Sequence, residues 1–160
     1  MAGDLIVDPV NRFRGRSEHS LDGKGRLNIP TRFREVLRLQ YDDRLMVTPW
    51  DRCLKVYPVL QWEKLETQLL EHLQDQPDMR MKKMIRYMIG GVVECPLDKQ
   101  GRILLPPKLR EEGGINKEVV INGVIDYFEI SDKQTWETDN NPSTADYESF
   151  EVSLLKSGLL

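Results

Sequence analysis

The residues best placed to do chemistry form two sets of aspartate, glycine and arginine at one spacing. The chain reads LDGKGRLNIP over 21–30 and LDKQGRILLP over 97–106, and these sets are Asp22, Gly25 and Arg26, then Asp98, Gly101 and Arg102. A glycine suits a tight reversal because it adopts positive φ without steric cost. Each aspartate can accept hydrogen bonds from the turn amides or pair with the arginine four residues later. The pattern predicts two braced, exposed basic loops.

Such loops could bind nucleic acid. Lysine and arginine neutralise phosphates, and an arginine held by an aspartate can present its guanidinium to guanine O6 and N7. The candidate DNA contacts are the cations in and before the loops, namely Arg14, Arg16, Lys24, Arg26, Lys99 and Arg102. The alternative is that Arg26 and Arg102 only form ion pairs that close their own loops. The two interpretations overlap, since a braced arginine is also better positioned to contact a base.

The remaining reactive residues do not resemble a catalytic or metal site. His19 and His72 are the only histidines, and neither has metal-ligand spacing with another histidine or a cysteine. The run at 23–26 lacks the spacing of a phosphate-binding loop. Cys53 and Cys95 are isolated, which favours two reduced cysteines over a disulfide or a metal site. We therefore expect no catalysis, no cofactor and no small-molecule substrate.

The elements that must position the loops also occur twice. Each motif predicts a strand, an exposed loop, a second strand and then a short helix, with Phe33, Val36 and Leu37 facing inward in the first copy. Further strands are predicted at 45–48, 54–58, 119–122 and 127–131 from their β-branched and aromatic residues. Trp62 and Trp136 follow at equivalent places. Two such copies indicate a pseudo-twofold fold in which each half completes the core of the other.

Helices are predicted between the copies and at the C-terminus. Apolar spacing favours amphipathic helices over 62–73 and 78–91, the second with Asp78 as its N-cap. Four methionines in the second helix could form an adaptable interface or pack on the chain's own core. The acidic segment at 145–155 could form a terminal helix or a mobile tail.

The charge of the chain is unevenly distributed. The net charge of −3 argues against a nucleic-acid binder at first sight. However, residues 12–38 carry a net charge of +5 and residues 80–110 carry +6, whereas residues 111–160 carry −8. The basic charge is therefore concentrated around the two motifs. No apolar run approaches the ~20 residues that cross a bilayer, and no secretion signal is recognisable, so we expect a cytoplasmic protein without a membrane partner.

The sequences FRGRSEHSLDGKGRLNIPTRFREVL and ECPLDKQGRILLPPKLRE resemble the MraZ family of bacterial transcriptional regulators, which carries two AbrB-like Asp-x-x-x-Arg motifs. The resemblance covers about residues 13 to 137. It implies an α+β fold in which two pseudo-symmetric AbrB-like repeats form a swapped-hairpin, β-barrel-like core with flanking helices. The implied division is an N-terminal extension (1–12), a first repeat (13–62), linking helices (63–91), a second repeat (92–137) and an acidic C-terminal tail or helix (138–160).

The resemblance also implies a function. It predicts a sequence-specific DNA-binding regulator that forms a ring-shaped homo-oligomer and binds short G-rich direct repeats in double-stranded promoter DNA. The expected outcome is repression of the division and cell-wall gene cluster, including its own gene, by a nucleoid-associated protein. The alternative is an oligomeric protein-interaction scaffold whose loops are purely structural. Because Gln100 stands where the first loop has Lys24, we expect Lys24 and Arg26 to contribute most to DNA contact and Arg102 to serve mainly as structure.

Overall fold

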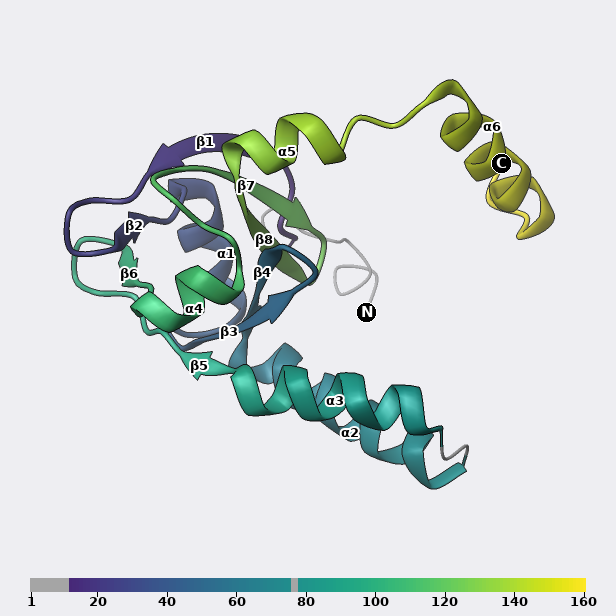
Figure 1. The fold of residues 1–160 in the computed structure, drawn as a ribbon, viewed down its shortest axis with the longest axis horizontal. Coiled ribbons are helices and arrows are strands. Elements are labelled where there is room, and N and C mark those ends of the chain that lie inside the picture. The colour runs from purple at the N-terminus through teal and green to yellow at the C-terminus, as the bar shows by residue number, and fades with distance from the viewer. Residues whose placement is uncertain (1–11, 76–77) are drawn as a thin grey trace, which may run out of the picture.

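The computed structural model describes residues 12–75 and 78–160 (Figure 1). The predicted N-terminal extension, apart from Arg12, lies outside these residues. The first half contains β1 (Arg16–Ser20), β2 (Arg26–Asn28), α1 (Thr31–Gln40), β3 (Leu45–Trp50) and β4 (Cys53–Pro58). Two helices follow, α2 (Val59–Asp75) and α3 (Met79–Gly91). The second half contains β5 (Val93–Glu94), β6 (Arg102–Leu104), α4 (Pro107–Glu112), β7 (Glu118–Val124), β8 (Tyr127–Asp132), α5 (Lys133–Asp139) and α6 (Thr144–Lys156).

The strands form two antiparallel sheets. The larger sheet has the order β1-β7-β8-β4-β3-β5, and the smaller one pairs β2 with β6. This arrangement corrects the expected barrel-like core, because the described strands form no closed barrel. The reason lies in the pairing: β1 and β5 stand at opposite edges of the larger sheet, and β2 and β6 hydrogen-bond only with each other among the described strands.

Strand pairing joins the two halves of the chain. β1 pairs with β7 of the second half, and β5 pairs with β3 of the first half. β4 pairs with β8, and β2 with β6, so both sheets are built across the halves. Each strand of the larger sheet has a counterpart in the other half: β1 and β5, β3 and β7, β4 and β8. When every strand is replaced by its counterpart, the order is the same read from the opposite edge. Neither half completes a sheet alone.

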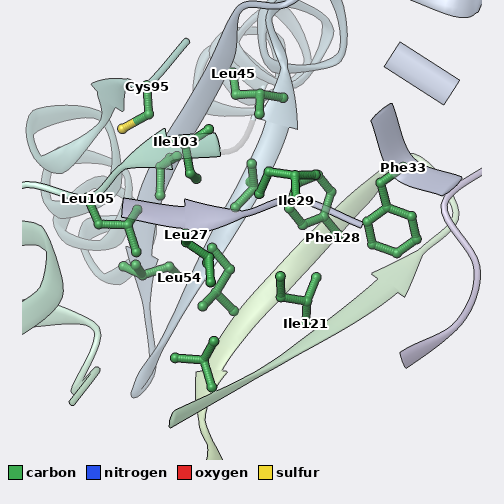
Figure 2. Close-up of a cluster of buried hydrophobic side chains, with 14 of the residues drawn as sticks. Leu27, Ile29, Phe33, Leu45, Leu54, Cys95, Ile103, Leu105, Ile121 and Phe128 are labelled. Atoms are coloured by element: carbon green, nitrogen blue, oxygen red, sulfur yellow. The ribbon is translucent and has the colours of Figure 1, made fainter. Parts of the chain in front are cut away.

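The hydrophobic core lies between the two sheets. Figure 2 shows Leu27 of β2 and Ile103 of β6 beside Leu54, Ile121 and Phe128 of the larger sheet. All five side chains are at most 1% exposed. The predicted sharing of one core by both halves is confirmed. The smaller sheet therefore has one face fixed by apolar burial and the other directed to solvent.

The predicted helices are present. In α1, Phe33, Val36 and Leu37 are buried as expected. Asp78 caps α3, because its side chain accepts a hydrogen bond from the backbone N–H of Arg80. The α2–α3 hairpin extends away from the sheets in Figure 1.

A second apolar cluster attaches this hairpin to the body of the molecule. It contains Tyr57, Trp62 and Met88. Of the methionines in α3, Met88 is buried whereas Met79 and Met84 are exposed. Core packing therefore accounts for only part of the methionine stripe.

Two C-terminal helices follow the last strand. The sequence did not predict α5, which carries the half-buried Trp136 at its fourth position. Asp132 caps this helix by accepting a hydrogen bond from the backbone N–H of Gln134. The terminal segment forms a helix, α6, and Figure 1 shows it beyond α5, away from the sheets.

Candidate nucleic-acid interface

The first loop is closed by one carboxylate. Asp22 Oδ1 accepts hydrogen bonds from the backbone N–H groups of Lys24 and Arg26, each at 2.9 Å. Asp22 Oδ2 accepts from Nε of Arg26 at 2.6 Å. The backbone closes the same turn, since the N–H of Gly25 donates to the carbonyl of Asp22 at 3.0 Å. The side chain of Arg26 is thereby held at one edge of its guanidinium.

The second loop repeats these contacts and adds one. Asp98 Oδ1 accepts from the backbone N–H groups of Gln100 and Arg102 at 2.9 Å, and Asp98 Oδ2 accepts from Nε of Arg102 at 2.9 Å. In addition, Nη2 of Arg102 donates to Oε1 of Gln100 at 2.7 Å. The Arg102 side chain is 23% exposed, whereas the Arg26 side chain is 33% exposed. Arg102 is therefore held through two of its nitrogens and Arg26 through one.

Hydrogen bonding to the charged carboxylate changes its acidity. The pKa of Asp22 is lowered to about 2, chiefly because the backbone N–H of Arg26 donates to it. The pKa of Asp98 is lowered for the equivalent reason, the hydrogen bond from the backbone N–H of Arg102. Both loops are thus braced by ionised carboxylates at neutral pH.

Both glycines of the motifs are required by the backbone. Gly25 has φ +83° and Gly101 has φ +77°, the left-handed region that other residues adopt at a cost of roughly 1–2 kcal/mol. Each glycine also joins its loop to the opposite half. The carbonyl of Gly25 accepts from the N–H of Leu105, and the carbonyl of Gly101 accepts from the N–H of Ile29, both at 3.0 Å. The two loops are therefore fixed to one another.

Two arginines from the helices α1 and α4 make further contacts between the two halves at these loops. Nε of Arg34 in α1 donates to the carbonyl of Ile29, and Nε of Arg110 in α4 donates to the carbonyl of Leu105, both at 3.0 Å. A Cβ added to Gly101 would lie 2.4 Å from Arg34, and one added to Gly25 would lie 3.2 Å from Arg110. Each loop therefore contacts an arginine of the opposite half. Sequence reasoning assigned no role to these arginines, although their equal distance from the motifs was a usable signal.

The outer face of the smaller sheet brings the two motif arginines together. Arg26 lies opposite Leu104, and Asn28 lies opposite Arg102. Since Leu27 is buried between them, Arg26 and Asn28 point to the other face, and the same alternation holds for Arg102 and Leu104. The two arginines are diagonal neighbours across the strand pair, at a typical spacing of about 7–8 Å. Figure 1 shows both loops projecting from the same side of the molecule.

The structure separates the other candidate contacts. Lys24 and Lys99 are exposed in the loops, beside the motif arginines. Arg14 and Arg16 instead lie at or before the start of β1, at the opposite end of that strand from the first loop. Nε of Arg16 donates to Oδ1 of Asn122 at 3.0 Å, and its guanidinium lies 4.6 Å from the ring centre of Trp136. The structure therefore places Arg16 in a packing contact with the second half.

The other candidate reactive residues are scattered over the described part of the chain. There, no group of three or more His, Cys, Asp or Glu side chains has the arrangement of a metal site, and no helix is long and apolar enough to span a bilayer. His19 lies on β1, where Ser17 Oγ is 2.7 Å from its Nε2. Cys53 and Cys95 are free, and burial raises the pKa of these thiols to about 12 and about 11.

Comparison with known proteins identifies relatives along most of the chain. Residues 12–85 and 88–148 match a family described as "MraZ protein, putative antitoxin-like". A protein of Syntrophobacter fumaroxidans named "Transcriptional regulator MraZ" is 50% identical over 125 residues, which are 78% of this chain and 82% of that protein. Proteins of the same name from Desulforapulum autotrophicum and Desulfosudis oleivorans are 39% and 36% identical, over 88% and 92% of this chain and 93% and 99% of their own lengths.

Proposed function

This chain belongs to the MraZ family, and we propose that it is a transcriptional regulator that binds specific DNA sequences through the outer face of the β2–β6 sheet. One observation carries the proposal: Arg26 and Arg102 lie on that face, diagonal to one another, with a braced basic loop beside each. Relatives of this chain are named transcriptional regulators, which is a class of binding proteins and not of enzymes.

The dimensions of the sheet support this proposal. Two neighbouring strands lie about 4.8 Å apart, and the DNA major groove is about 12 Å wide and admits a two-stranded β-ribbon. An arginine held through Nε keeps its two Nη atoms for guanine O6 and N7, the commonest specific contact in the major groove. Among the described residues, the guanidinium of Arg26 donates only to Asp22, whereas that of Arg102 also donates to Gln100. Arg26 is accordingly the proposed base-reading residue and Lys24 a phosphate contact.

Arg102 and Lys99 have a smaller part in this proposal. Arg102 serves mainly to complete the second loop, and Lys99 adds charge at its tip. Arg14 and Arg16 lie at the opposite end of β1 from the first loop, so their proposed part is limited to peripheral phosphate contacts. The acidic helix α6 lies across the molecule from both loops in Figure 1, away from the proposed DNA face.

The finer parts of the proposal follow the family resemblance. Repeats at 13–62 and 92–137, linked by helices at 63–91 and flanked by residues 1–12 and 138–160, would form the swapped-hairpin unit. Copies of this unit would assemble into a ring that binds short G-rich direct repeats. A head-to-tail ring presents its loops in one direction, which suits direct repeats better than palindromes. The regulated genes would be the division and cell-wall cluster, including the chain's own gene, in the cytoplasm at the nucleoid.

A salt titration tests DNA binding by the unmodified chain. The probe is the DNA upstream of its own gene, and binding is followed by gel shift at several salt concentrations. The logarithm of the affinity should fall linearly with the logarithm of salt, with a slope of about −0.9 for each phosphate contact. As a control, the spacing between the repeats is changed by about five base pairs, half a helical turn, which places one repeat on the opposite side of the duplex. No binding, or binding insensitive to both salt and spacing, would favour the protein-interaction scaffold.

A further inference from the structure

The C-terminal helix α6 lacks apolar packing of its own. Its start is closed by a capping box between Ser143 and Asp146, and Gly158 at φ +72° ends it. None of its residues is buried, and Tyr147 and Phe150 are each 61% exposed. An isolated helix shorter than about 12–15 residues is marginal in water, so this capped 13-residue helix is suited to gain stability from a partner.

Three apolar side chains of α6 lie along one stripe with acidic residues beside it, whereas Val152 and Leu155 are exposed on other sides of the helix. Tyr147, Phe150 and Leu154 recur at intervals of three and four residues, which places them along one stripe. Asp146 and Glu151 flank that stripe in the helical arrangement. A matching surface should therefore combine an apolar centre with basic edges.

The outer face of α3 has this composition. Met84 and Tyr87, three residues apart, are 54% and 52% exposed. The exposed residues around them are basic, and they include Arg80, Lys83 and Arg86. The helix carries no acidic residue, so its charge is the opposite of that of α6.

A hollow lies at the end of this face, between α3 and α4. It has a volume of about 380 Å³, and its lining includes Tyr87, Gly90 and Leu109. Arg86 and Lys108 contribute basic side chains to its wall, and Glu112 contributes one acidic side chain. A Cβ added to Gly90 would meet no atom within 4 Å, so the floor is open to an incoming side chain. The hollow thus offers an apolar site with two cations and one carboxylate in its wall.

We propose that α6 of one copy docks on the α3–α4 groove of a second copy, with Phe150 in the hollow beside Gly90. Asp146 and Glu151 then face the cations of α3 and α4. In Figure 1 the sheets lie between α6 and α4, so each chain presents α6 and its α3–α4 groove on separate parts of its surface. A contact between two different surfaces of identical chains is heterologous and can close into a ring. The inference rests on the oligomerisation included in the proposed function and supplies a contact for it.

Cross-linking tests which surfaces meet. Two differently tagged full-length chains are co-expressed, one carrying Glu151→Cys and the other Lys83→Cys, and treated with a short bis-maleimide. These changes leave the apolar residues in place, and Cys53 and Cys95 should react slowly because their thiols are partly or fully buried. The expected product joins the two tags. The matched control replaces Lys83→Cys with Gln68→Cys, an exposed position on α2, and should give at least tenfold less product.

A second pair of variants measures how much α6 contributes to the stability of the oligomer. Phe150→Ser should raise the dissociation constant of the oligomer at least tenfold in sedimentation velocity, whereas Val152→Ser, on another side of α6, should leave it within about twofold. The contact between α6 and the groove alone would be overturned by two results together: an unchanged oligomer in Phe150→Ser, and no mixed product from the Glu151→Cys and Lys83→Cys pair. A parent chain that stays monomeric at all concentrations would overturn both this contact and the proposed ring. DNA binding by the parent is measured separately by gel shift, so failure of the α6 contact is distinguishable from failure of DNA binding.

Discussion

The two motif loops have nearly the same backbone but hold their arginines differently. Each aspartate accepts two backbone hydrogen bonds and one from the Nε of its arginine. In the second loop, Gln100 takes a further hydrogen bond from Arg102, at a position where the first loop has Lys24. The same turn can thus free an arginine for a ligand or hold it in place, depending on one neighbouring side chain. On this comparison we propose that recognition rests mainly on Arg26.

The largest expected effect separates the two arginines. Arg26→Ala should weaken binding to the upstream DNA at least about 100-fold, because a bidentate base contact contributes roughly 1–3 kcal/mol and several loops engage together. Arg102→Ala should weaken it by less than about fivefold. The affinities are measured by fluorescence anisotropy under one salt condition.

Stability provides the control for this pair. Both ion pairs are partly exposed, and solvent-screened pairs of this kind contribute little to stability, so both variants should melt within a few degrees of the parent and keep its oligomeric state. Equal losses of affinity in the two variants would remove the distinction between the loops. Unfolding of Arg26→Ala would instead make Arg26 a structural residue.

A smaller effect is expected when the second loop is made more like the first. Gln100→Lys removes the acceptor that holds Arg102 and adds a positive charge at the tip. Affinity should rise about two- to tenfold at low salt, and the salt slope should steepen by about 0.9 for one added phosphate contact. Gln68→Lys on α2 adds the same charge away from the proposed face and should change neither quantity. Loss of affinity in Gln100→Lys would show that the hydrogen bond from Arg102 to Gln100 is needed for binding.

The smallest effect concerns pH. The folded loop lowers the pKa of Asp22 to about 2, below the value of about 3.9 in an unfolded chain. The bracing contribution is therefore fully present above about pH 4 and is lost as pH falls towards 2. The pKa of Asp98 is lowered in the same direction. Carboxyl ¹³C NMR titration should find both midpoints below 3.9, and a midpoint at or above that value would show that the loop is not closed in solution.

The loops were predictable from sequence because their structure is local. Asp22, Gly25 and Arg26 meet within five residues, and the second copy repeats the spacing. The helices with clear apolar stripes were predictable for the same reason. The helix α5 was missed because its seven residues include none that is fully buried, so the apolar pattern is weak.

The relations between the halves could not be obtained in this way. The register that sets Arg26 opposite Leu104 depends on pairing between residues 78 positions apart. The contacts of Arg34 with the second loop and of Arg110 with the first depend on the same pairing between the two halves. Likewise, the sequence places Arg16 close to the first loop, but an extended strand carries it away to Asn122. Proximity along the chain was a poor guide to proximity at the candidate site.

The location of the proposed DNA-binding face can be tested without removing a charge. Leu104 is 53% exposed on the outer face of β6, opposite Arg26, and Leu70 is 59% exposed on α2. A photoreactive benzophenone amino acid is placed at either position, and the protein is irradiated with labelled upstream DNA. We predict a strong cross-link from position 104 and none above background from position 70. A cross-link from position 70 alone would contradict the assignment of the β2–β6 face to DNA.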